Sequence, residues 1–288
     1  MVLRKVESTL KISIPHIFPE SIPTPESDGD LSRFFDQDFD DSPDGRIVGG
    51  NVAAVGSHPW MVALTSGVMA RSFFCGGSVL TQRTVLTAAH CIDNSFNFGS
   101  LSSSLRVTVG TNRWNQGGQT LALTGNATHP HYVRATIKND LTLLYTASNI
   151  IFNNLVRPVT LSFDYVGGGV QARAAGWGRT SANGPGSPQL LELLTPTIDG
   201  QRCVRDVRQA AIDLNFRNVP PVEPHIEICT FHSPGRGTCR GDSGSALMRV
   251  DRGQQIGVVS WGFPCARGAP DMFVRISAFQ SWFNQHIR

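Results

Sequence analysis

From residue 47 onward, the chain consists of short runs of β-forming residues separated by turn residues, and this pattern limits the fold more than any other feature. Typical runs are WMVALTSG (60–67), LRVTVG (105–110), QQIGVVSWG (254–262) and DMFVRI (271–276). Many short strands predict an all-β sandwich or a pair of barrels rather than alternating strand–helix units. The 29 glycines and 17 prolines supply turns, and only 16% of the residues are charged. No stretch approaches the roughly 20 apolar residues of a membrane span.

One helix is expected, at the C-terminal end of the chain. In SAFQSWFNQHIR (277–288), apolar residues recur at roughly helical spacing at Phe279, Trp282, Phe283 and Ile287, after a possible cap at Ser277. No long amphipathic helix is expected before this segment.

Residues 1–46 form a separate compositional unit. They contain 10 acidic and 5 basic side chains, and five prolines interrupt any periodic element. We expect this segment to be largely disordered. The rest of the chain carries 20 basic and 12 acidic side chains. Dispersed, solvated charge explains that excess better than a polyanion site, and no nucleic-acid partner is expected.

The cysteine pattern points to an oxidising compartment. The six cysteines, all after residue 46, are Cys75, Cys91, Cys203, Cys229, Cys239 and Cys265. An even number spread over a domain predicts disulfides, with 15 connectivities open. A zinc site is less favoured, because the sequence has no C-x-x-C pair. We expect an extracellular protein, although the first residues contain no clear signal peptide, since Pro15 and His16 break the only apolar run.

Three short motifs carry residues suited to nucleophilic catalysis. They are TAAHC with His90, NDLTLLYT with Asp140, and GDSGS with Ser243. Each motif alone has an ordinary explanation as a turn or a structural residue.

Together the three motifs meet a demanding chemical specification. A serine hydroxyl needs a general base, histidine titrates near neutrality, and a buried carboxylate can orient that histidine. The order His, Asp, Ser is one of the known orders of this triad. The backbone N–H groups of Gly241 and Ser243 can point at one oxygen and form an oxyanion hole.

The sequence resembles the trypsin/chymotrypsin-like serine endopeptidases. The matching motifs occur in family order and are RIVGG (46–50), CGGSVL (75–80), TAAHC (87–91), NDLTLL (139–144), GWG (176–178), CRGDSGS (239–245) and VSWG (259–262). The resemblance implies two six-stranded antiparallel β-barrels with the active site between them and a C-terminal helix. The barrels are expected over 47–160 and 161–288, joined through 156–163. The implied disulfides are Cys75–Cys91, Cys203–Cys229 and Cys239–Cys265.

The resemblance also implies that the protein is made as a zymogen with 1–46 as its pro-segment. Cleavage after Arg46, by another protease or by self-activation, would expose an α-amino group on Ile47. That ammonium would pair with Asp242 and organise the active site, since an unpaired buried charge is costly.

The substrate cleft follows from the same resemblance. Ser260 would hydrogen-bond the triad aspartate, Trp261 would line the cleft, and the backbone of Gly262 would pair with the substrate. At the base of the specificity pocket stands Gly237, where trypsin-like members have Asp. Asp271 replaces a usual glycine and can enter the space above Gly237, as in broad-specificity arthropod (brachyurin-type) members. The alternative is a shifted loop with Asp271 in solvent.

These features predict a secreted serine endopeptidase with a chymotrypsin-like or broad preference for the residue before the cut. We expect protein or peptide substrates, protein inhibitors as further partners, a monomer and no cofactor. No calcium is expected, because residues 106–128 contain no acidic side chain. Asn126 begins a glycosylation sequon. The rival functions are an inactive binding homologue, disfavoured by the complete triad, and a narrow cascade protease, disfavoured by the lack of a cysteine-rich pro-segment.

Overall fold

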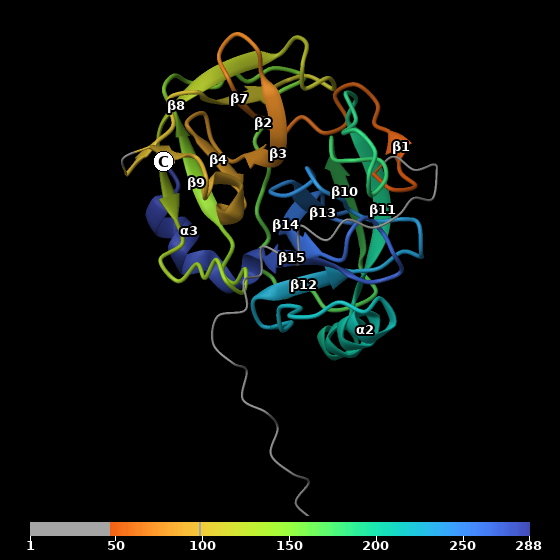
Figure 1. Ribbon diagram of the computed structural model, residues 1–288. Coiled ribbons are helices and arrows are strands. Elements are labelled where there is room, and N and C mark those ends of the chain that lie inside the picture. The colour runs from red at the N-terminus through yellow and green to blue at the C-terminus, as the bar shows by residue number, and fades with distance from the viewer. Residues whose placement is uncertain (1–46, 98) are drawn as a thin grey trace, which may run out of the picture.

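The computed structural model describes residues 47–97 and 99–288. The predicted pro-segment 1–46, with Arg46, lies outside the described residues. The described chain forms two β-barrels that lie side by side, the first in orange to green and the second in green to blue (Figure 1).

The first barrel is closed by six antiparallel strands in the order β2-β3-β4-β9-β8-β7. The strands are β2 (Met61–Ser66), β3 (Ser72–Val79), β4 (Thr84–Thr87), β7 (Leu105–Val109), β8 (Gln119–Thr128) and β9 (Thr142–Thr146). Buried aliphatic residues from these strands, such as Val62, Val107 and Leu143, fill its interior. The short hairpin of β5 (Phe96–Asn97) and β6 (Ser100–Leu101) lies outside the barrel.

The second barrel also has six antiparallel strands, in the order β11-β10-β13-β14-β15-β12, and the pairing of β11 with β12 closes it. The strands are β10 (Gln171–Gly176), β11 (Leu191–Ile198), β12 (Glu227–Thr230), β13 (Ala246–Arg249), β14 (Gln254–Gly262) and β15 (Asp271–Arg275). The two six-stranded barrels predicted from the sequence are confirmed. The interval between β9 and β10 contains the expected connection 156–163.

Each end of the described chain packs on the barrel formed by the other half of the chain. The short strand β1 (Asn51–Val52) adds to β11 of the second barrel. At the other end, the turn η2 (Ile276–Phe279) leads into α3 (Gln280–His286), which packs on the first barrel beside β9 (Figure 1). The Tyr145 hydroxyl donates to the backbone oxygen of His286 at 2.8 Å, which ties β9 to this helix.

The C-terminal helix is present, but it begins later than predicted and without the expected cap. Ser277 lies inside the 3-10 turn η2, and Phe279 precedes α3 with no side-chain capping hydrogen bond. The helix is held instead by burial of Trp282 and Phe283. The periodicity therefore identified the buried face, whereas the serine did not mark the start.

The expectation that no long helix precedes the C-terminal segment is wrong. Helix α2 (Gly200–Asp213) has 14 residues and lies against β12. Asp199 caps its first turn by accepting hydrogen bonds from the N–H groups of Gln201 and Arg202, both at 3.0 Å. Its narrow buried face consists of Cys203, Val207 and Ala210. The structure also contains a short 3-10 turn, η1 (Ala89–Ile92).

Three disulfides join Cys75 to Cys91, Cys203 to Cys229, and Cys239 to Cys265, the same pairs that the family resemblance implies. The second bond ties α2 to β12. Because these cross-links restrict the unfolded chain, each contributes to stability in an oxidising environment.

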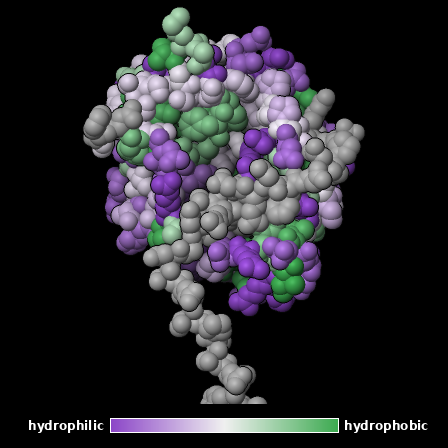
Figure 2. All heavy atoms as spheres, in the orientation of Figure 1, coloured by the Kyte–Doolittle hydropathy of each residue, from purple (hydrophilic) through white to green (hydrophobic). Residues whose placement is uncertain are grey.

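On the face of the molecule in Figure 2, hydrophobic residues form separate small patches among hydrophilic ones. None of the helices in the described ranges has the length and the apolar composition needed for a transmembrane span.

Candidate active site

The centre of the site is the fully buried carboxylate of Asp140, which receives hydrogen bonds from both barrels. Its Oδ2 lies 2.7 Å from Nδ1 of His90, and its Oδ1 accepts the backbone N–H of His90 at 2.9 Å. From the second barrel, Ser260 Oγ donates to Oδ2 at 2.7 Å. These bonds fix the orientation of the imidazole and leave Nδ1 as its donor to the carboxylate.

This environment makes the histidine more basic and the aspartate more acidic. Burial lowers the pKa of His90, but the charge of Asp140 and the hydrogen bond to it outweigh this effect and raise the pKa overall. For Asp140, burial raises the pKa, but the charge of His90 and the hydrogen bonds from His90 and Ser260 outweigh this effect and lower the pKa overall. The pair therefore stabilises an imidazolium next to a carboxylate, which is what a general base needs after it accepts a proton.

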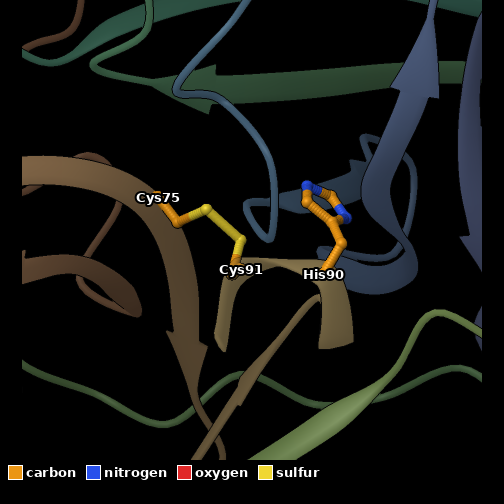
Figure 3. A group of neighbouring side chains, drawn as sticks. All are labelled: Cys75, His90 and Cys91. Atoms are coloured by element: carbon orange, nitrogen blue, oxygen red, sulfur yellow. A yellow bond between two sulfur atoms is a disulfide. The ribbon is translucent and has the colours of Figure 1, made fainter. Parts of the chain in front are cut away.

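His90 also stands beside the Cys75–Cys91 disulfide (Figure 3), and the three potential ligand atoms lie within 4.8 Å of one another. The two sulfur atoms are bonded to each other, so neither is a thiolate that could bind a metal ion. The disulfide instead links the turn η1, which carries His90, to strand β3.

Ser243 lies in a tight turn before β13. Its carbonyl accepts the backbone N–H of Gly76 at 2.8 Å, which joins this turn to the first barrel. Gly241, two residues earlier, has φ +99°, and a Cβ there would meet Gly178 Cα at 3.0 Å. Only glycine fits this position without strain. Within the described residues, Ser243 makes no side-chain hydrogen bond with His90, a contact that often tightens only when substrate binds.

Ser243 lines a hollow together with the residues predicted for the substrate cleft, Ser260, Trp261, Gly262 and Asp271. Gly237 lies beside it, because a Cβ at that position would lie 2.8 Å from Oδ2 of Asp271. The same oxygen accepts the backbone N–H of Thr238 at 2.9 Å. The structure thus brings Gly237 and Asp271 together, and the buried Asp271 side chain does not point into solvent.

Asp242 points away from this hollow into the protein, where it is fully buried. Its Oδ1 accepts the N–H of Gly178 at 2.8 Å, and its Oδ2 accepts the N–H of Cys239 at 3.0 Å. A Cβ at Gly176 or Gly178 would collide with this carboxylate. Sequence reasoning assigned no role to these two glycines, although their place in the GWG motif was the available signal.

The first residues of the described chain are buried near this region. Ile47 is fully buried and packs against Leu191 and Leu193. The Val48 carbonyl accepts the N–H of Gly237 at 3.2 Å. Val48, the second residue after Arg46, is therefore hydrogen-bonded directly to the segment that bears the predicted pocket.

A family model described as Trypsin matches residues 47–283. The chain belongs to the trypsin family of serine peptidases. It is 32% identical over 242 residues to trypsin delta of Drosophila erecta, covering 83% of this chain and 87% of the relative. It is 34% identical over 246 residues to trypsin, alkaline C of Manduca sexta, covering 84% of this chain and 91% of the relative. Trypsin alpha-4 of Lucilia cuprina is 31% identical over 242 residues, covering 83% and 86%.

This trypsin-family protein is thus a serine endopeptidase that acts on protein substrates. The three relatives bear trypsin names, so they support the family and not the narrower resemblance to chymotrypsin-like or brachyurin-type members.

The buried carboxyls predict an unusual pH dependence of stability in the uncut chain. Burial raises the pKa of Asp242 to about 7, despite the lowering effect of the hydrogen bonds from Cys239 and Gly178. The folded chain therefore holds this proton more tightly than the unfolded chain, whose aspartates titrate near pH 4. Stability from this group is full below about pH 4 and is lost as the pH rises through about 7.

The measurement is the melting temperature between pH 5 and pH 8 of the uncut chain, with Ser243→Ala to prevent self-cleavage. Adding Asp242→Asn should reduce the fall in melting temperature, because the titrating carboxyl is gone. Asp206→Asn, a change at a half-buried position on α2, should leave the fall as it was. Parallel curves for the Asp242→Asn protein and its parent would contradict the assigned protonation.

Proposed function

We propose that the chain is the precursor of a secreted serine endopeptidase, activated by cleavage after Arg46, with a His90–Asp140–Ser243 triad. Three disulfides in the described part of the chain support export to an oxidising compartment. The family match begins at Ile47, which supports 1–46 as a pro-segment outside the catalytic domain.

In the proposed mechanism, Ser243 Oγ attacks the scissile carbonyl while His90 Nε2 accepts its proton. The backbone N–H groups of Gly241 and Ser243 stabilise the oxyanion. Collapse of the tetrahedral intermediate breaks the peptide bond, and His90 returns the proton to the leaving amine. Water then hydrolyses the acyl-enzyme by the same route. The observation that carries this proposal is the double hydrogen bond by which buried Asp140 holds His90.

Removing the nucleophile tests the mechanism. The activated Ser243→Ala variant should lose activity by about 10⁴- to 10⁶-fold in kcat, because losing a triad member costs this much in relatives. Its circular dichroism and melting temperature should match those of the parent, since one hydroxyl is removed. Peptidase activity within tenfold of the parent would refute the proposed triad.

Activation is proposed to work through a new ion pair. Cleavage after Arg46 would give Ile47 an ammonium group, and Asp242 would become its counter-charge. The support is that Asp242 is fully buried and that, among the described residues, its carboxylate contacts only backbone N–H donors. A buried carboxylate in this state is poorly stabilised and would gain from a cation.

Two variants should separate cleavage from ion pairing. Arg46→Gln should prevent cleavage by a trypsin-like activating protease, so the chain should stay uncut and its peptidase activity should stay very low. Asp242→Asn should remain poorly active even after cleavage, because the buried ammonium would lack its partner. Activity assays would be paired with N-terminal sequencing to establish the cut. Full activity of either the uncut chain or the cleaved Asp242→Asn protein would contradict this scheme.

For specificity, we infer a broad pocket that accepts both apolar and basic side chains at the residue before the cut. The absence of a side chain at Gly237 makes room for the Asp271 carboxylate, and Phe263 and Pro264 line the hollow. The carboxylate of Asp271 offers a partner for Arg or Lys. Burial raises its pKa to about 7, so a basic substrate side chain would favour its ionised form. Acceptance of Arg would also permit self-activation at Arg46.

Asp271→Gly tests this pocket. The activated variant should lose cleavage after Arg and Lys by at least about tenfold in kcat/KM, which corresponds to one buried charge-assisted contact. Cleavage after Phe and Leu should persist, and the control Asp206→Ala, on helix α2, should change neither activity. An unchanged Arg-to-Phe ratio would place the basis of specificity elsewhere and favour a plain chymotrypsin- or elastase-like enzyme.

A further inference from the structure

A buried ion pair joins the two barrels next to the substrate cleft and has no part in the proposed triad. Lys138 Nζ lies 2.7 Å from Oε1 of Glu227, and the two side chains are only 5% and 3% exposed. Lys138 belongs to the loop between β8 and β9 of the first barrel, whereas Glu227 begins β12 of the second. Lys138 is also the only lysine after residue 46. The one lysine of residues 47–288 is thus buried, where its charge is costly to remove from water.

Glu227 connects this ion pair to the wall of the cleft. Trp261 Nε1 donates to the same Oε1 at 2.7 Å, and Oε2 accepts the backbone N–H of Glu223 at 2.6 Å. Lys138 Nζ lies 4.9 Å from the centroid of the Trp261 ring, within range of a cation–π contact. The indole is therefore held through its N–H group by Glu227 and at its ring by Lys138.

The backbone around Lys138 is constrained to make this contact. Ile137 and Asn139, on either side, have φ of 50° and 54°. A β-branched residue rarely adopts this conformation, and such outliers persist where the surrounding structure imposes them. Ile137 is 5% exposed and belongs to the same buried cluster as Trp261. Asn139 donates to the carbonyl of His131 at 2.8 Å, which fixes the other side of the loop.

The loop that carries Asp140 is consequently attached to the second barrel at two neighbouring points. One is the hydrogen bond from Ser260 to Asp140, and the other is the ion pair of Lys138 with Glu227. Ser260 and Trp261 are adjacent on β14. The first attachment sets the triad, and the second sets the ring that lies beside it.

We propose that the Lys138–Glu227 pair positions Trp261 and thereby determines how well the enzyme binds substrate residues upstream of the scissile bond. This rests on the proposed function and on the hollow that Trp261 lines together with Ser243. A buried ion pair adds little net stability, because desolvation offsets its attraction, but it fixes direction. Trp261 is only 4% exposed and lines the hollow beside Ser243, so a shift of its ring would change the surface that an extended peptide meets more than the surface that a short amide meets.

The test compares two substrates with the same residue before the cut, one a single blocked residue and one extended upstream by several residues. In the activated enzyme, Lys138→Met removes the cation and should lower the ratio of kcat/KM for the extended over the short substrate by about tenfold, equivalent to about 1.4 kcal/mol of lost binding. The change should appear mainly in KM for the extended substrate. Arg202→Met, which breaks the exposed Arg202–Asp206 pair on α2, should leave the ratio unchanged.

Trp261→Phe is the second variant, and it keeps the inference testable if Lys138→Met does not fold. It keeps an aromatic ring but removes the five-membered ring of the indole and with it the N–H donor to Glu227, so the ratio should fall in the same direction. In the double variant the two losses should be less than additive, since both act through one ring position. An unchanged ratio in Trp261→Phe, or an equal loss on both substrates in Lys138→Met, would overturn the inference.

Trp261→Ala separates this inference from the proposed cleft. If Trp261→Ala leaves the ratio unchanged, Trp261 does not line the cleft. The assignment of Trp261 to the cleft and the positioning role of the ion pair would then both be refuted, whereas the proposed triad would not be affected. If Trp261→Ala lowers the ratio and Lys138→Met does not, the cleft stands and the positioning role of the ion pair is refuted.

Discussion

The structure depends on the burial of the Asp140 carboxylate at the junction of the two barrels. A buried charge is stable only when every lone pair has a suitable donor. Here the donors come from His90 on the first barrel and Ser260 on the second, so the carboxylate is satisfied only while the barrels are docked. The chemistry of the site and the association of the barrels therefore rest on the same few hydrogen bonds.

Two more buried carboxylates, Asp242 and Asp271, lie on the second barrel near this junction, and they differ from Asp140 in lacking a cationic side chain among the described residues. Asp242 accepts hydrogen bonds from the backbone N–H groups of Gly178 and Cys239, and Asp271 accepts them from the backbone and side chain of Thr238. Under the proposed function, each has its own cation: the new chain end for Asp242 and a substrate side chain for Asp271. Cleavage of the pro-segment would thus supply the cation for Asp242, and a basic substrate would supply the cation for Asp271.

The sequence predicted the strands well, and it singled out the motifs that bear His90, Asp140 and Ser243, because both kinds of signal depend on local patterns. Alternation along short runs marks barrel strands, and the glycines around Ser243 mark a constrained turn. Helix α2 was missed because its buried face has only three residues and its exposed face is rich in arginine, so its signal lay mainly in the Asp199 cap. Ser277 misled for the opposite reason: a capping residue type was present, but a 3-10 turn occupied the position.

Contacts between distant residues were beyond prediction from one sequence. Lys138 and Glu227 are 89 residues apart, and neither belongs to a recognisable motif. The proximity of Gly237 and Asp271 could be inferred only from the family resemblance. Thr238, which follows Gly237 and donates to Asp271, is 33 residues away from it in the sequence. Such pairs are set by how strands assemble, and residue type alone does not determine which partners meet.

The crossing of the chain ends has a consequence for how the molecule is divided. Strand β1 pairs with β11 of the second barrel, and α3 covers the first, so each barrel packs against a segment from the far end of the polypeptide. A cut near residue 160 would therefore not yield two self-sufficient halves, because each would lack a piece that the other carries. The barrels are separate in architecture but interlocked in covalent connectivity, and evolution can exchange them as modules only if the ends move with them.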